Sequence, residues 1–279
     1  MLKGNEVWRP LCERYFPILD PSDINDFQGA YQTVYSNFIK GIYASSLLAQ
    51  VSGIESVAIT DEMLFASSRF YDLIGAYDLK TGKKTTFKGH TDIVRCVAIA
   101  DGILFSGSND RTIKAWDIKA GKCLTTFQCE SAVYSVAVAD GVLFAGVGDG
   151  IIKIWNMKTE ECLTIQGHAE LVSSVAIADG ILFSGSWDNT IKAWDIKTGK
   201  CLTTYQGHTG FVNAVVVADG ILFSGPHDET IKAWDIKTGK CLMTFQGHTK
   251  QVESIAIADG MLFSGSRDKT IKVWDIKTG

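Results

Sequence analysis

The sequence lacks a long apolar run and an excess of basic charge. No window reaches the roughly 18 apolar residues of a membrane-spanning helix, and the first twenty residues contain no apolar segment of a secretory signal. The 27 Lys and Arg are set against 31 Asp and Glu, for a formal net charge of −4, so no basic face is expected to bind phosphates. These absences predict a soluble, cytoplasmic protein that binds neither membranes nor nucleic acid.

The sequence also lacks the spacings of a disulfide framework or a metal site. Of its seven cysteines, Cys123, Cys162, Cys201 and Cys241 recur every 39 or 40 residues and are therefore one position of a repeat. Equivalent positions of successive repeats are too far apart to form a disulfide, which predicts reduced thiols. No Cys and His occur at ligand spacing within one loop. We therefore expect neither a metal nor a cofactor.

What is present is a repeat. The second copy contains four short segments rich in β-branched and aromatic residues, at 94–100, 103–108, 112–118 and 123–127, and turn-forming residues separate them. The first segment of each copy is apolar at almost every position, as in strands covered on both faces. Four-stranded sheets of this kind bury their faces against one another when they are stacked around an axis. The sequence thus predicts an all-β, six-bladed β-propeller over 43–279. The positions that mark the copies are Tyr77, Trp116, Trp155, Trp194, Trp234 and Trp274.

A Gly-His pair precedes a Trp-Asp pair by about 26 residues in four of the copies. This pattern resembles the WD-repeat family over residues 43–279. The third copy departs from it with Cys129-Glu130 and Trp155-Asn156, and the first with Gln50 and Tyr77-Asp78. The resemblance implies a buried network in each blade. In this network the histidine hydrogen-bonds the turn aspartate, while a serine of the second strand and the tryptophan of the third strand complete the chain. The implied sets are His90, Asp110 and Trp116; His168, Asp188 and Trp194; His208, Asp228 and Trp234; and His248, Asp268 and Trp274.

The sixth copy ends at Gly279, after its third strand. The segment Tyr43–Gln50 aligns with Cys201–His208, the fourth strand and loop of an earlier copy. We therefore expect this N-terminal segment to be the missing fourth strand and to close the ring. The alternative is a seven-bladed parent that has been cut short.

Residues 1–42 lie outside the repeats. Phe27, Tyr31, Val34, Tyr35 and Phe38 fall on one face of a helix, and we expect this stripe to pack on the propeller. The segment 5–17, NEVWRPLCERYFP, is similar to the end of an F-box, although the helices that bind the ligase adaptor are missing. This resemblance implies a substrate receptor of a ubiquitin ligase, with the adaptor as a partner.

No residue pattern predicts catalysis. The glycine-rich stretch at 146–151 occupies a turn of the repeat, whereas a nucleotide-binding loop lies between a strand and a helix. The His and Asp residues recur once per blade, whereas an active site assembles once. The competing hypothesis is an enzyme or small-molecule binder that uses the central channel. It needs one convergent polar set at the channel mouth, and the copies are expected to supply none.

What varies between the copies is the set of positions that WD-repeat proteins use on the top face of the propeller. They flank the start of the first strand or precede the turn aspartate, and they include the aromatic and arginine residues typical of interaction hot spots. We therefore expect a monomeric, non-catalytic scaffold that binds a protein or peptide there. The candidate residues are Glu55, Ile93, Arg95, Asn109, Tyr134, Leu171, Trp187, Phe211, Asn213, His227, Glu253 and Arg267.

Overall fold

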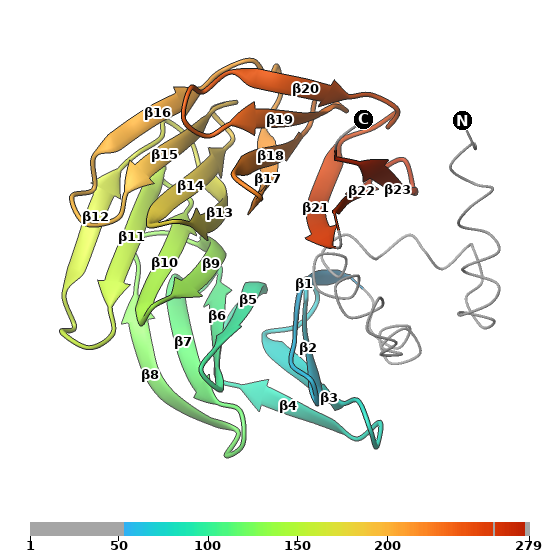
Figure 1. Cartoon of the computed structure of the whole chain (residues 1–279). Coiled ribbons are helices and arrows are strands. Elements are labelled where there is room, and N and C mark those ends of the chain that lie inside the picture. Colours follow the sequence, from blue (N-terminus) through green and yellow to red (C-terminus); the bar gives the residue numbers. More distant parts are fainter. Residues whose placement is uncertain (1–52, 259, 277–279) are drawn as a thin grey trace.

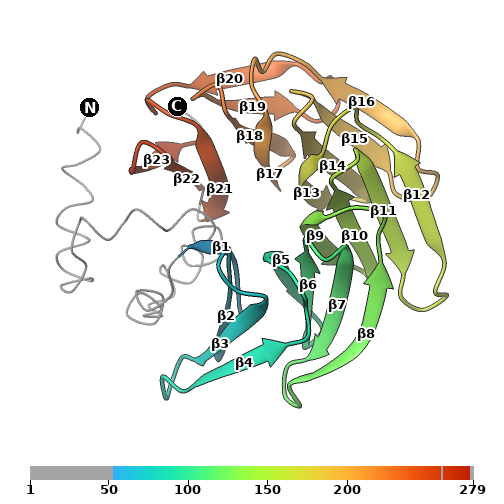
Figure 2. The same ribbon diagram turned by 180° about the vertical axis from the view of Figure 1, so that it is seen from behind.

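The computed structural model describes residues 53–258 and 260–276. They form six antiparallel sheets arranged as the blades of a propeller around a central axis (Figures 1 and 2). The predictions for residues 1–52, namely the helical extension, the F-box-like segment and the closing strand, lie outside the described residues.

Each blade is built from strands consecutive in the chain. Blades 1 to 5 have four strands, and the described part of blade 6 has three. Their bounds are β1 (Ile54–Ile59), β2 (Met63–Ser68), β3 (Leu73–Asp78) and β4 (Lys84–Lys88); β5 (Val94–Ala100), β6 (Ile103–Ser108), β7 (Thr112–Asp117) and β8 (Lys122–Gln128); β9 (Val133–Ala139), β10 (Val142–Val147), β11 (Ile151–Asn156) and β12 (Cys162–Gln166); β13 (Val172–Ala178), β14 (Ile181–Ser186), β15 (Ile191–Asp195) and β16 (Cys201–Tyr205); β17 (Val212–Ala218), β18 (Ile221–Pro226), β19 (Ile231–Asp235) and β20 (Cys241–Phe245); β21 (Val252–Ala258), β22 (Met261–Ser266) and β23 (Ile271–Asp275).

The turns that join first to second strands follow from local sequence. In blade 2, Asp101 and Gly102 have φ of 50° and 75°. Two successive residues of positive φ are characteristic of the tight hairpin turns that match strand twist, and Asp-Gly suits them. The same pair occupies this turn in blades 3, 4 and 5, at Asp140-Gly141, Asp179-Gly180 and Asp219-Gly220. We call this end of the blades the bottom face, and the end where the first strands begin the top face.

The hydrophobic cores lie between blades. In each core, one face of a blade packs on the opposite face of the next, as Phe65, Ile74 and Phe87 of blade 1 pack with Leu104 and Trp116 of blade 2. The rings of Phe87 and Trp116 meet edge to face with centroids 5.8 Å apart. Four further clusters join blades 2 to 3, 3 to 4, 4 to 5 and 5 to 6 in the same way. Blade stacking, rather than any single sheet, therefore buries the apolar side chains.

The junction between blades 6 and 1 is different. Ile54, Leu64 and Tyr77 of blade 1 form a separate cluster, which contains no residue of blade 6. Strand β23 is only partly buried, and both ribbon views show blades 6 and 1 standing further apart than the other neighbours (Figures 1 and 2). The hydroxyls of Tyr77 and Ser254, on the two sides of this junction, are buried and have no hydrogen-bond partner among the described residues. The described residues thus leave this junction without the core that joins every other pair of blades.

Candidate interaction surface

A β-bulge at the start of every first strand creates the candidate surface. In blade 2, Val94 pairs with Ser108 and Cys96 with Gly107, so Arg95 lies between them as the bulged residue. A bulge leaves one residue outside the ladder and redirects its side chain. The same register shift occurs in the other five blades. The six bulged residues are Glu55, Arg95, Tyr134, Ser173, Asn213 and Glu253.

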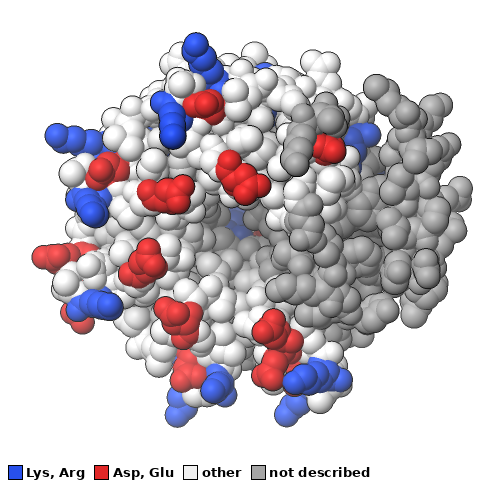
Figure 3. Space-filling model, in the orientation of Figure 1, with Lys and Arg blue, Asp and Glu red and all other residues white. Residues whose placement is uncertain are grey.

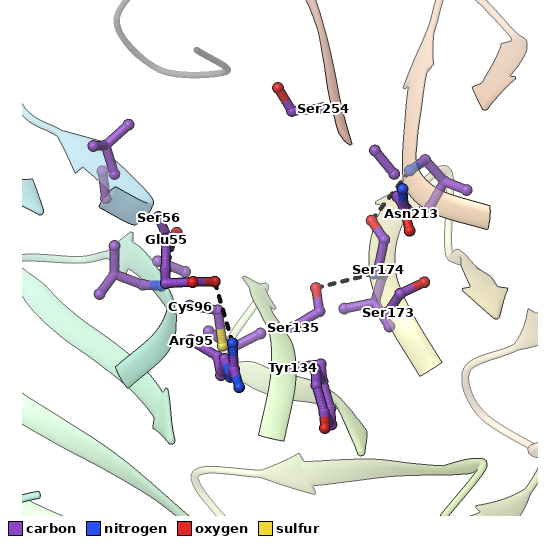
Figure 4. Close-up of a pocket in the computed structure, with 18 of the residues that line it drawn as sticks. Glu55, Ser56, Arg95, Cys96, Tyr134, Ser135, Ser173, Ser174, Asn213 and Ser254 are labelled. Atoms are coloured by element: carbon purple, nitrogen blue, oxygen red, sulfur yellow. Dashed lines mark hydrogen bonds and ion pairs between the residues drawn. The ribbon is translucent and has the colours of Figure 1, made fainter. Parts of the chain in front are cut away.

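These bulged side chains converge on the channel. They line a cavity of about 390 Å³ whose wall is made by the first strands of all six blades. Figure 4 shows Glu55, Arg95, Tyr134, Ser173 and Asn213 around it. The expectation that the copies supply no convergent polar set at the channel is therefore wrong. The bulge brings six different side chains to one level, although each repeat contributes only one.

The bulged residues contact their surroundings around the mouth, mostly on the next blade. The Arg95 guanidinium lies 5.7 Å from the Tyr134 ring centroid, and its Nε donates to Asn109 Oδ1 at 2.9 Å. Ser173 Oγ donates to the carbonyl of Val212, and Asn213 Nδ2 donates to the carbonyl of Val252 at 2.9 Å. Each of these contacts except that with Asn109 reaches the next blade along the chain. The polar mouth is therefore held in place by contacts between blades.

Below the mouth, serine hydroxyls repeat this bonding between blades. Ser56 Oγ accepts from Val97 N, Ser135 Oγ from Val175 N and Ser174 Oγ from Val215 N, each at 3.1 Å. Ser254 occupies the same position in blade 6 and is the buried hydroxyl without a partner at the junction described above. These bonds fix neighbouring first strands relative to one another.

An aromatic cluster lies beside the mouth on blades 4 and 5. The rings of Trp187 and Phe211 stack with centroids 4.8 Å apart and an interplanar angle of 4°, and the His227 ring lies 5.2 Å from that of Phe211. Gln251 Nε2 lies 3.0 Å from His227 Nδ1, where the amide donates to the imidazole. Burial lowers the pKa of His227, Glu253 acts in the opposite direction, and Arg267 lowers it further. The cluster is therefore uncharged at neutral pH.

The candidate residues divide into those brought together and those that are not. Trp187 and Phe211 are 36% and 38% exposed, whereas Leu171 is 9% exposed and serves the core. Asn109 accepts from Arg95, and its backbone N donates to the Ile93 carbonyl. Sequence reasoning missed Ser173 and Arg69. Aligning the first strands on their bulges would have found Ser173, because it takes the position of Arg95.

The distribution of charged side chains can be seen on the face shown in Figure 1. There, acidic side chains lie above, to the left of and below a central hollow, and lysines and arginines lie mainly outside them (Figure 3). A group of acidic side chains alone identifies no ligand. Among the described residues, no group of three or more His, Cys, Asp or Glu is placed to hold a metal ion, and no helix is long and apolar enough to cross a membrane.

The blades that present this surface are held internally by histidine networks. In blade 2, His90 Nδ1 lies 2.7 Å from Asp110 Oδ2, its Nε2 lies 2.8 Å from Ser106 Oγ, and Trp116 Nε1 donates to the same hydroxyl at 2.8 Å. A neutral imidazole satisfies every group: the indole donates to the serine, the serine to Nε2, and Nδ1 to the carboxylate. The same contacts join His168, Ser184, Asp188 and Trp194; His208, Ser224, Asp228 and Trp234; and His248, Ser264, Asp268 and Trp274.

Blade 3 replaces this network with an ion pair. Glu130 takes the histidine position, and Lys153, which is buried, donates to its Oε1 at 2.7 Å. Lys153 also lies 5.8 Å from the Trp155 ring centroid. The blade thereby keeps a polar contact between its loop and its third strand. Among blades 2 to 6, this loop is thus held to its blade by a histidine chain in four and by an ion pair in blade 3.

Acid should destabilise the propeller through these networks. Burial lowers the pKa of His90 and His248 below 6.5, against the attraction of Asp110 and Asp268. Burial would raise the pKa of Asp268, but hydrogen bonds from Thr270 and His248 outweigh it and hold that pKa at about 2. The unfolded chain therefore binds more protons than the folded chain below pH 6.5, and again as the aspartates titrate below about 4. We expect the urea midpoint to be constant from pH 8 to 7 and then to fall in these two ranges; a midpoint that rises from pH 7 to 5 would contradict the assignment.

Comparison with known proteins agrees with this architecture. The family described as WD domain, G-beta repeat matches residues 159–195, 199–235 and 239–275, and the TEP-1 C-terminal beta-propeller family matches residues 90–141. The crystal structure of the computationally designed Ika8 protein is similar, with 32% sequence identity and a TM-score of 0.73. That match covers 81% of this chain and 71% of the designed chain. No curated protein matches the sequence significantly.

Proposed function

Because the chain belongs to the WD40-repeat β-propeller family, we propose that it is a non-catalytic scaffold that binds a protein or peptide on its top face. The exposed Trp187–Phe211 stack beside the channel mouth carries this proposal. Large aromatic side chains at the surface are enriched where proteins bind one another, and here they adjoin the bulged polar residues. Such a surface offers apolar area and hydrogen-bonding groups together.

Replacing Trp187 and Phe211 with Ala should abolish partner capture without changing the thermal unfolding midpoint by more than a few degrees. Both rings are more than one-third exposed, so the core loses little. The matched control is Leu202→Ala with Leu242→Ala, since these leucines are 53% and 55% exposed on the outer strands β16 and β20. The measurement is quantitative affinity capture from cell lysate by mass spectrometry. Equal capture by the Trp187/Phe211 variant and the control would count against the top face.

We further propose that Tyr43–Gln50 supplies the fourth strand of blade 6. Support comes from Tyr77, which occupies the tryptophan position of blade 1 and is only 1% exposed. In blades 2, 3, 5 and 6 that position packs on an aromatic residue of the fourth strand of the preceding blade. Leu47 aligns with that aromatic residue, Tyr205 in blade 4. A strand at 43–50 would place Leu47 against Tyr77 and join blades 6 and 1 through a core like those between the other described blades.

The F-box-like segment at 5–17 supports a finer proposal, that the protein presents bound substrates to a ubiquitin ligase in the cytoplasm as a monomer. The test is whether cullin and adaptor subunits accompany the full chain in a pull-down. A chain in which Trp8 and Leu11 are replaced by Ala should lose them and still capture the top-face partner.

A further inference from the structure

Arg95 lines the channel mouth, and Arg69 and Arg267 lie beside it, paired with the lining residues Glu55 and Glu253. Arg267 and Arg69 occupy the same turn, between the second and third strands, in blades 6 and 1, and Arg95 is the bulged residue of blade 2. The stacked Trp187 and Phe211 lie on blades 4 and 5. Arg69 and Arg95 therefore lie across the cavity from the uncharged aromatic pair, whereas Arg267, on the blade next to Phe211 and His227, is close enough to affect the pKa of His227.

The carboxylates beside these arginines are already engaged. Glu55 Oε1 lies 3.1 Å from Arg69 Nε, and its Oε2 lies 3.5 Å from Arg95 Nη1, so one carboxylate balances two guanidinium groups. Glu253 pairs with Arg267. Three arginines thus face two glutamates around the mouth, and the local balance is positive.

The guanidinium groups are also the more exposed partners. The side chains of Arg69, Arg95 and Arg267 are 43%, 28% and 54% exposed. Those of Glu55 and Glu253 are 17% and 16% exposed. A ligand that approaches the mouth therefore meets guanidinium donors before it meets carboxylates. Guanidinium is the side-chain group best matched to the two oxygens of a carboxylate or phosphate.

From this arrangement we infer that the top face binds a peptide that carries an anionic group, carboxylate or phosphate, beside an apolar side chain. The anionic group binds Arg69 and Arg95, where two guanidinium groups share one carboxylate, and the apolar side chain covers Trp187 and Phe211. Ser173 and Asn213 line the cavity wall between these positions. This inference rests on the proposed top-face function and specifies the chemistry of its partner.

The experiment uses a phage-displayed library of random peptides selected on the full-length protein. We expect the enriched sequences to place Asp or Glu near a Leu, Phe or Ile. A labelled enriched peptide is then measured by fluorescence anisotropy at low and high salt, and its affinity should fall as salt screens the charges. Versions with phosphoserine or with Ala at the acidic position identify the anion. Tighter binding of phosphoserine assigns phosphate, tighter binding of the acidic residue assigns carboxylate, and equal binding of Ala overturns the inference.

The site is tested with a triple variant, Arg69→Gln with Arg95→Gln and Glu55→Gln. The third substitution is included because the charge of Glu55 would otherwise be left unpaired. Loss of charge-assisted hydrogen bonds should weaken the binding of the labelled peptide about tenfold or more. Lys197→Gln removes the same net charge at the bottom face and should leave binding unchanged. Peptides without acidic residues, or acidic peptides unaffected by the triple variant, would overturn this inference. If such peptides still require Trp187 and Phe211 for binding, the proposed scaffold function is retained. If the wild-type protein enriches no peptide, this inference is overturned, and affinity capture from lysate tests the scaffold function separately.

Discussion

Replacing Asp188 with Ala should destabilise the propeller by about 2 to 3 kcal/mol, an effect expected when a buried donor loses the charged acceptor of its hydrogen bond. Asp188 Oδ2 lies 2.8 Å from His168 Nδ1, and its Oδ1 accepts from Thr190 N at 2.9 Å and Thr190 Oγ1 at 2.6 Å. The imidazole of His168 is buried, so its Nδ1–H would lose its acceptor without access to water. Urea denaturation at pH 7.5, followed by tryptophan fluorescence, measures the loss.

The chain contains a matched control for this substitution. Asp149 occupies the same turn in blade 3 and is exposed. In this blade Glu130 replaces the histidine, so Asp149 has no imidazole partner. Asp149→Ala should therefore change the stability by no more than about 0.5 kcal/mol. Similar losses for Asp149→Ala and Asp188→Ala would mean that the turn, rather than the histidine network, is what the aspartate stabilises.

Deleting residues 1–50 should lower the thermal midpoint by roughly 10 °C or more. If Tyr43–Gln50 is the fourth strand of blade 6, the deletion removes several ladder hydrogen bonds, at about 1 kcal/mol each, and the burial of Tyr43 and Leu47, at roughly 1.5 to 3 kcal/mol each. Each kcal/mol shifts the midpoint of a domain of this size by about 2 to 4 °C. Deleting only residues 1–42 keeps the strand and should preserve most of the midpoint.

Two point substitutions in the full chain test which residues of the proposed strand face the core. Leu47 aligns with Tyr205, which is buried, and Ser46 aligns with Thr204, which is exposed. Successive residues of a strand point to opposite faces. Leu47→Asp should therefore lower the midpoint strongly and Ser46→Asp only slightly. Equal effects, or a deletion of 1–50 that leaves the midpoint unchanged, would exclude this segment as the closing strand.

The repeated strands were predictable because their determinants are local. The β-branched and aromatic runs and the turn-forming residues between them, Asp101-Gly102 after β5 and Asn109-Asp110 after β6, mark the ends of β5, β6 and β7 to within a residue of their position in the structure. The spacing of His90, Asp110 and Trp116 indicated a network, since the repeat carries the same residues to the same places in each blade. The departure at Glu130 was visible too, but its pairing with Lys153 was not, because the lysine of this position points elsewhere in the other copies.

The candidate site was harder to predict. A bulge depends on how two strands pair, so the sequence around Arg95 does not show that this residue lies outside the hydrogen-bonded ladder. The sequence therefore predicted five of the six bulged residues as top-face positions, but indicated neither Ser173 nor the convergence of all six on one cavity. Leu171, which the sequence also placed among the contact residues, is only 9% exposed.

By itself the sequence determined the strands, their turns and the number of repeats, because these depend on residues close together along the chain and recur with a period of 39 or 40. Only the tertiary structure decided which side chains share a surface. Glu55, Arg69 and Arg95 come from two blades, and Trp187 and Phe211 from two others, and they meet because each blade buries its faces against its neighbours. The stacking of blades is a long-range consequence of apolar burial, and it brings one bulged residue from each repeat to a common channel.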